Sequence, residues 1–238
     1  MSSIRFQRRA GAFSLIELLI VISIIAIIAG FSIPAVTSVL KGSALTQAGT
    51  ALEDQMSMAR QHALGNNRLV QVRFYRYADP EMPGEKVDDP STGQFRAIQY
   101  FERSPGGIWS PVGKVVRLPD SMMMNPTERF STILGEDNAT RLVLANKVQA
   151  DPNNHVELPR GVKFNYDYIY IHFTPSGGTD LKVLGNPGRS SSGGLWYITM
   201  HSIVDLTSAT PSSNPPNYFC WMVDPVTGVG RVYKPGVK

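Results

Sequence analysis

Phe13 to Leu40 reads FSLIELLIVISIIAIIAGFSIPAVTSVL, and this stretch decides the fold. After Glu17 no charged residue occurs from Leu18 to Leu40, a run of 23 residues rich in Ile, Leu, Val and Ala. A bilayer core about 30 Å thick needs roughly 20 helical residues, so this run is long enough to cross a membrane. We therefore expect an apolar helix and a membrane-anchored chain.

The flanks of the apolar run predict its orientation. Arg5, Arg8 and Arg9 precede it and no comparable basic cluster follows at once, so the amino terminus should stay cytoplasmic and the remainder should cross the membrane. The run exceeds the usual apolar region of a cleaved signal, and Gly30 to Pro34 offers no well-placed small-x-small cleavage site. We expect a retained single span, with a plain signal anchor as the simplest alternative.

Composition narrows the classes of function. The 238 residues carry a net charge of +4, but the three arginines before residue 12 account for most of it, which leaves 20 basic against 19 acidic residues from Phe13 onward. This near-equality of positive and negative charge gives no indication of a nucleic-acid partner. The single cysteine, Cys220, excludes an intrachain disulfide and a cysteine-rich metal cluster.

Glu17 is the residue that a plain anchor does not explain. It lies four residues inside the apolar segment, where an unpaired ionised carboxylate costs several kcal/mol. No basic residue lies nearby on the same helical face, since Arg9 precedes the segment. We infer that a partner charge comes from another copy or another chain.

Gly11-Ala12-Phe13-Ser14-Leu15-Ile16-Glu17-Leu18-Leu19-Ile20-Val21-Ile22 resembles the amino-terminal signature of type IV pilins and type II secretion pseudopilins. The resemblance implies that a leader, residues 1–12, is removed between Ala12 and Phe13 and that Phe13 is methylated. Glu17 then becomes the fifth mature residue, and Pro34 falls where such helices bend. The residue before the cut is usually Gly, so a cut after Gly11 is the alternative, although it would shift Glu17 to position six.

The resemblance also implies a function and partners. The chain would be a structural subunit, of the minor kind, in a type IV pilus-like or type II secretion pseudopilus filament. Its partners would be a prepilin peptidase, other subunits and an inner-membrane assembly platform. Glu17 would pair with the terminal amine of a neighbouring Phe13, so that docking removes the cost of the buried carboxylate. The head would lie in the periplasm before assembly.

Residues 13–34 should form the membrane and assembly helix, and residues 35–65 an amphipathic continuation. From Val36 and Val39 to Ala63, apolar residues recur at helical spacing opposite a polar face. Gly65-Asn66-Asn67 supplies the stop, because Gly and Asn tolerate the left-handed conformation that ends helices.

Residues 66–238 should form a β-rich head, which gives an α+β fold with a long helix packed on an antiparallel sheet. Alternating or β-branched segments bounded by turn residues predict the strands. They are Leu69–Tyr77, Phe95–Glu102, Lys114–Leu118, Arg141–Leu144, Val162–Phe164, Tyr168–Phe173, Leu195–His201, Tyr218–Val223 and Val229–Tyr233. Residues 78–94, 185–194 and 207–217 are predicted to be exposed loops.

The carboxyl half resembles the H-type minor pseudopilins and FimT-like pilins. The resemblance is carried by Leu158-Pro159-Arg160-Gly161-Val162, by Ile171-His172-Phe173-Thr174-Pro175-Ser176-Gly177-Gly178, and by Trp221-Met222-Val223-Asp224-Pro225-Val226-Thr227-Gly228. The chain is longer than this branch, and its length is similar to that of pseudopilin-like cassette proteins from Verrucomicrobia.

No arrangement of residues indicates an enzyme, a cofactor or a metal centre. Two further interpretations remain open. Asp79, Glu81, Glu85, Asp88 and Asp89 could hold calcium in a flexible loop, although their spacing fits no EF-hand and prolines favour a solvated loop.

Arg68, Arg73, Arg76, Tyr75 and Tyr77 form the only basic and aromatic run that could contact DNA or a surface polymer. Alternation divides the run between two faces, which favours an ordinary solvated strand face and makes nucleic-acid binding the lesser alternative.

Overall fold

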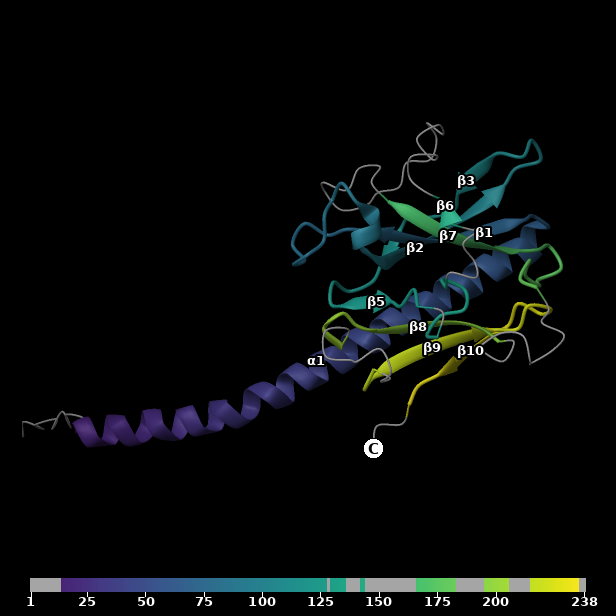
Figure 1. Ribbon diagram of the computed structural model, residues 1–238. Helices are drawn as coiled ribbons and strands as arrows, with labels where there is room; N and C mark the ends of the chain where they lie inside the picture. Colours follow the sequence, from purple (N-terminus) through teal and green to yellow (C-terminus); the bar gives the residue numbers. More distant parts are fainter. Residues whose placement is uncertain are drawn as a thin grey trace, which may run out of the picture. The chain divides into compact units, whose positions relative to one another are not determined.

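The computed structural model describes residues 14–127, 129–135, 142–143, 166–182, 195–205 and 215–235, without the side chains of 30–38 and 142–143. The chain divides into two compact units, Met1–Lys41 and Gly42–Lys238. The described residues of the first unit form the beginning of a helix, and the second unit holds the rest of that helix and all the described strands (Figure 1). The expected α+β class is confirmed.

The helix α1 spans Leu15–Asn66. It ends where Asn67 adopts a left-handed conformation, with φ of 52°, and the Arg68 amide donates to the Ala63 carbonyl at 3.2 Å. Asn is one of the few residues with a side chain that visits this conformation routinely, so the predicted stop signal is confirmed. The helix continues through residue 34, and the bend expected at Pro34 stays a prediction.

One stripe of α1 in the second unit is buried. Its members, each at most 2% exposed, are Ala48, Leu52, Met56, Ala59 and Ala63. The absence of a side chain at Gly49 lets the Phe219 ring lie against the helix, because a Cβ there would stand 2.2 Å from it. Val39 and Leu40 were expected on the same stripe, and this is wrong: they are 70% and 62% exposed. Both precede the second unit, where the packed stripe begins.

All the described strands belong to one antiparallel sheet with the order β10-β9-β8-β5-β2-β1-β7-β6, while β3 and β4 pair with β2. The strands are β1 (Val70–Tyr77), β2 (Gln94–Arg103), β3 (Trp109–Pro111), β4 (Val116–Arg117), β5 (Met122–Met124), β6 (Leu142–Val143), β7 (Asp167–Phe173), β8 (Trp196–Ser202), β9 (Tyr218–Val223) and β10 (Gly230–Tyr233).

Strand β5 joins two halves of this sheet. Met124 lies opposite Phe95 of β2 on one side and Met200 of β8 on the other. Figure 1 shows the half containing β1, β2 and β7 and the half containing β8 to β10 on opposite sides of the second part of α1. One hydrophobic core therefore joins the helix to both halves, with Phe74 and Trp221 among its fully buried members.

The longer predicted strands are confirmed to within two residues, because alternation over six or more positions is a strong local signal. Lys114–Leu118 shortens to the two residues of β4, Arg141–Leu144 contains β6, and Val162–Phe164 lies outside the described residues. Strands β3 and β5 were not predicted. Trp109-Ser110-Pro111 and the three methionines of β5 are too short to show a period. Strand β3 is extended because it pairs with the adjacent strand β2, and β5 because it pairs with the distant strand β8.

Of the predicted loops, only residues 78–94 are fully described. The prediction of an exposed loop is partly wrong, because Ala78 is 1% exposed and a short 3-10 helix, η1 (Pro90–Thr92), lies within it. All of 185–194, and residues 207–214 of the third loop, lie outside the described residues.

Candidate functional site

The first turn of α1 is closed by a capping box. The Ser14 hydroxyl accepts a hydrogen bond from the Ile16 amide at 3.3 Å, and the Glu17 Oε2 accepts one from the Ser14 amide at 3.0 Å. This reciprocal pair satisfies amides that a helix start otherwise leaves without partners. The signal, Ser-x-x-Glu before an apolar run, was present in the sequence, and sequence reasoning assigned Glu17 without recognising Ser14 as its partner.

Glu17 keeps capacity for another donor. Both Ser14 and Glu17 are exposed, and no hydrogen bond from the described residues reaches Oε1 of Glu17. A carboxylate at a helix amino terminus is also stabilised by the helix dipole. The arrangement therefore holds one negative charge in place at the beginning of α1 and leaves one of its oxygens able to accept a cationic donor.

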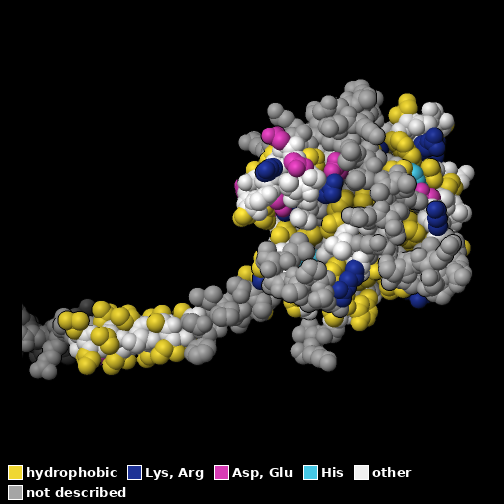
Figure 2. Space-filling model, viewed as in Figure 1, with side chains coloured by type: hydrophobic (Ala, Val, Ile, Leu, Met, Phe, Trp, Pro, Cys, Tyr) yellow, Lys and Arg dark blue, Asp and Glu magenta, His cyan; other side chains and the backbone are white. Residues whose placement is uncertain are grey.

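Apolar side chains surround this carboxylate. The exposed residues Leu15, Ile16, Leu18, Leu19 and Ile20 begin a coat that continues to Ile28, seen as yellow atoms along the helix in Figure 2. Monomeric soluble proteins rarely expose so large an apolar surface. Within the described part of the chain, no helix has the combination of length and hydropathy needed for a membrane span. Gly11, Ala12 and Phe13 lie outside the described residues, so the predicted cleavage site stays a prediction.

Three residues of the basic and aromatic run, Arg73, Tyr75 and Tyr77, are buried, which corrects the expectation of a solvated strand face, while Arg68 and Arg76 are partly exposed. Arg73 is 3% exposed, and its guanidinium carbon lies 3.8 Å from the centre of the Phe101 ring and 4.7 Å from that of Tyr168. Tyr75 and Tyr77 are 0% and 3% exposed. Burial raises the pKa of Tyr77 to about 12, so its hydroxyl stays protonated.

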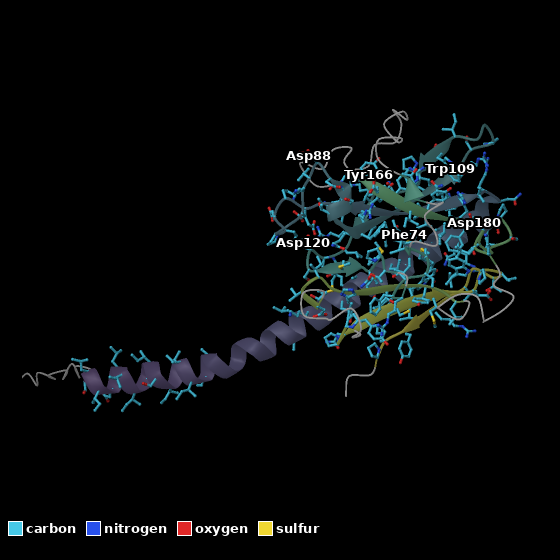
Figure 3. The ribbon with its side chains drawn as sticks, viewed as in Figure 1. Phe74, Asp88, Trp109, Asp120, Tyr166 and Asp180 are labelled. Atoms are coloured by element: carbon cyan, nitrogen blue, oxygen red, sulfur yellow. The ribbon has the colours of Figure 1, made fainter. Side chains whose placement is uncertain are left out.

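The reason is that both faces of β1 are covered. One face meets the core around Phe74, and the other meets a second apolar cluster that contains Tyr166 and has Trp109 packed against it. Figure 3 places Phe74 next to α1 and places Tyr166 and Trp109 on the other side of the sheet. Arg73, Tyr75 and Tyr77 therefore offer no accessible surface to phosphates or bases.

A chain of polar contacts follows Arg73 along this covered face. Arg73 Nε donates to Oε1 of Gln71 at 2.6 Å, and Nε2 of Gln71 lies 3.1 Å from Nε2 of His172. Nδ1 of His172 lies 2.7 Å from Oδ2 of Asp180, while the ring stacks on Trp109 at 5.4 Å between centres. Because Arg73 Nε donates to the oxygen of Gln71, the Gln71 amino group points to Nε2 of His172. This histidine serves packing and orientation.

The acidic loop is neutralised from within the chain. Arg96, which is 3% exposed, donates two hydrogen bonds to Glu85, at 2.5 and 3.0 Å, and lies 3.9 Å from Asp79. Asp89 accepts from the amide and hydroxyl of Ser91, which lower the pKa of its carboxyl group. Within the described residues, no three His, Cys, Asp or Glu side chains are placed to hold a metal ion. The cation held by this loop is Arg96.

The other two described histidines, His62 and His201, have structural partners, and Cys220 is buried. Nε2 of His62 lies 2.6 Å from Glu102, and this hydrogen bond is the main reason that the pKa of Glu102 is lowered. His201 is buried, which lowers its pKa, and contacts Asn125 at 2.8 Å. Burial raises the pKa of the Cys220 thiol and so disfavours the reactive thiolate.

Two of the carboxyl-half motifs meet at one arginine of α1. Arg60 Nε donates to the Gly177 carbonyl at 3.1 Å and to the Thr227 carbonyl at 2.9 Å. Gly228 has φ of +64°, and a Cβ there would stand 2.1 Å from the Gly177 oxygen. The Thr-Pro-Ser-Gly-Gly turn after β7 and the Asp-Pro-Val-Thr-Gly turn between β9 and β10 are thus locked together, and sequence reasoning gave no sign of Arg60 between them.

Comparison with known proteins adds one family match. The model of the prokaryotic N-terminal methylation motif matches residues 7–33. No curated protein matches the chain. Among solved structures, two of the minor pseudopilin EpsH from the type II secretion system of Vibrio cholerae are similar, with 11% and 9% identity and a TM-score of 0.37 each. They cover 84% and 82% of this chain and 99% of their own, and similarity at this score supports no argument about function.

The matched segment contains every residue that sequence reasoning assigned to processing and assembly. Gly11, Ala12, Phe13 and Glu17 lie within it, and the match ends one residue before Pro34. The same segment leads into a long helix whose second part packs on an antiparallel sheet. The chain thus carries the prokaryotic N-terminal methylation motif at the beginning of its long helix, in agreement with the resemblance of this segment to type IV pilins and type II secretion pseudopilins.

Proposed function

We propose that this chain is a structural subunit, of the minor kind, of a type IV pilus-like or type II secretion pseudopilus filament. A prepilin peptidase removes residues 1–12 and methylates Phe13. Residues 13–34 then hold the subunit in the inner membrane, residues 35–65 continue the helix, and the head of residues 66–238 lies in the periplasm. Other subunits and an inner-membrane platform draw the helix into the filament.

The observation that carries this proposal is the single carboxylate of Glu17 within an exposed apolar helix that matches the methylation motif. Removal of the leader leaves a positive amine on Phe13. When that amine from one subunit meets Glu17 of the next, two charges that are costly in an apolar setting neutralise each other. The Ser14 amide positions the carboxylate for this contact and survives cleavage, so Glu17 is held in place before the neighbour arrives.

Processing is tested by co-expressing the full chain with a prepilin peptidase, then determining the amino-terminal sequence and intact mass of the membrane-extracted protein. We expect a new terminus at Phe13 with one added methyl group. A terminus at Ala12 would place the cut after Gly11 instead. An intact Met1 terminus both with and without the peptidase would contradict the proposal and favour a plain signal anchor.

Two substitutions separate the charge of Glu17 from its capping role. Glu17→Gln keeps an oxygen that can accept from the Ser14 amide but removes the charge, whereas Glu17→Ala removes both. We expect both variants to be inserted and processed, and neither to be incorporated into filaments, with Asp88→Asn on the head surface as the control. Normal incorporation of Glu17→Gln would overturn the charge pairing while leaving the capping box intact.

A further inference from the structure

A polar groove lies between α1 and the β9–β10 hairpin, within the second unit. Its helix side is formed by Glu53, Asp54, Ser57 and Arg60, and its hairpin side by Gly228 to Gly230, with Met56 and Trp221 at its base. The groove has a volume of about 250 Å³. It is therefore smaller than the roughly 300–1,000 Å³ of sites for drug-sized ligands and cofactors, and its size suits a side chain with its adjoining peptide group.

The base of the groove holds an indole N–H that has no acceptor among the described residues. Trp221 is 1% exposed, and its ring belongs to the core. No acceptor among the described residues receives a hydrogen bond from its Nε1, whereas Nε1 of Trp196 donates to the Lys182 carbonyl at 2.8 Å. Buried indole N–H groups usually find an acceptor. An acceptor supplied from outside the chain would satisfy this one.

Gly230 keeps the indole edge open to the groove. A Cβ at this position would stand 2.3 Å from Nε1 of Trp221 and 2.7 Å from the neighbouring ring carbon. The φ of Gly230 is not in the left-handed region, so the backbone conformation does not itself require glycine. The missing side chain is explained by space at the indole edge, where the N–H meets the groove.

The wall opposite the hairpin is negatively charged. Glu53 and Asp54 are exposed neighbours on α1, and no described cation forms an ion pair with either of them. Arg60, the one cation among the described residues that line the groove, donates from its Nε to the carbonyls of Gly177 and Thr227. The groove thus presents two carboxylates at its mouth and a single N–H donor at its base.

We propose that this groove binds a basic peptide segment of a partner protein. A Lys or Arg side chain of the segment lies beside Glu53 and Asp54, and a neutral main-chain carbonyl of the same segment accepts the hydrogen bond from Trp221 Nε1. A metal ion fits poorly, because the indole N–H cannot act as a ligand and two carboxylates leave most positions of a hard cation unfilled. An anionic ligand would be repelled by both carboxylates.

The test follows the Trp221 indole directly. The full chain is labelled with ¹⁵N on its three tryptophan indoles and held in detergent micelles. The resonance of Trp221 is assigned by Trp221→Phe, or by elimination with Trp109→Phe and Trp196→Phe if that variant does not fold. The probe is N-acetyl-Gly-Lys-Gly-amide, and the matched control is the same peptide with norleucine, which has a similar length and no charge.

We expect the lysine peptide to shift the Trp221 N–H saturably, leaving the other two indoles unchanged, and the norleucine peptide to bind more weakly. The loss of two exposed charge contacts predicts that E53Q/D54N weakens binding about tenfold. E81Q/D88N removes the same charge from exposed positions on the acidic loop and should leave binding unchanged.

Three results would overturn this proposal: a Trp221 resonance that does not move, equal shifts with both peptides, or unaltered binding to E53Q/D54N. The proposal is independent of filament assembly, because the probe binds to one chain in micelles. Failure here would leave processing and Glu17 pairing untouched, and failure of those would leave the groove as a site for a basic partner of another kind.

Discussion

Replacing Glu85 with Gln should strongly destabilise the head. The carboxylate of Glu85 is 8% exposed and receives two hydrogen bonds from Arg96, whose side chain is 4% exposed, and one from the Asp79 amide at 2.8 Å. In Glu85→Gln, one oxygen becomes an amino group that faces the guanidinium, and the buried positive charge loses its main partner. The acidic loop should then detach from β2.

The size of the effect follows from the burial of the pair. Removing one partner of a buried ion pair costs about 3–5 kcal/mol. Asp79, at 3.9 Å from Arg96, still compensates part of the charge, so we expect the lower end, about 3 kcal/mol. For a chain of this length each kcal/mol lowers the melting temperature by roughly 2–4 °C, which gives a fall of about 6–12 °C.

Thermal unfolding of the full chain in detergent micelles, followed by circular dichroism, measures this change. Glu81→Gln is the control, because Glu81 is exposed in the same loop and forms no ion pair with a described residue. The reasoning is refuted if Glu85→Gln melts within about 2 °C of the unaltered chain, or if both variants lose the same stability.

Two further predictions concern acid sensitivity and glycine. The hydrogen bond from His62 lowers the pKa of Glu102 in the folded chain. The stability that this carboxylate contributes is therefore present above its unfolded pKa and is lost as the pH falls through its folded pKa. When the melting temperature is measured at decreasing pH, it should fall less steeply below about pH 4 for Glu102→Gln than for the unaltered chain. Gly228→Ala should lower the melting temperature, because the φ of Gly228 is +64° and a Cβ there would stand 2.1 Å from the Gly177 oxygen. Gly42 lies in an exposed part of the helix, and no atom lies within 4 Å of the position of its Cβ. Gly42→Ala should therefore raise the free energy of unfolding by about 0.5–1 kcal/mol. A loss of stability in Gly42→Ala comparable to that in Gly228→Ala would contradict the steric argument.

Local sequence was sufficient for the long elements. The apolar run after Phe13, the position of Glu17 and the stop at Asn67 were all evident, because helix formation and termination depend on residues within a few positions of one another. The longer strands were evident for the same reason, since a period of two is visible over six or more residues. The capping partner of Glu17 was also visible in the spacing, and only its role was missed.

The burial of polar groups was decided by tertiary structure. Alternation places Arg73, Tyr75 and Tyr77 on one face of β1, but whether water or protein covers that face depends on distant segments such as β7 and Tyr166. The pairing of Glu85 with Arg96 likewise depends on how residues 78–94 fold back onto β2.

The groove beneath the β9–β10 hairpin could not be predicted at all. Arg60 donates hydrogen bonds to carbonyls more than a hundred residues away in the sequence. The sequence pattern indicates only that Trp221 is a buried aromatic residue in a strand. Sequence by itself determined the helix, the longer strands and the amino-terminal motif, because those follow from contacts between near neighbours. The tertiary structure decided which side chains are covered, which charges are paired and where an indole N–H has no acceptor among the described residues, because those follow from contacts between segments far apart in the chain.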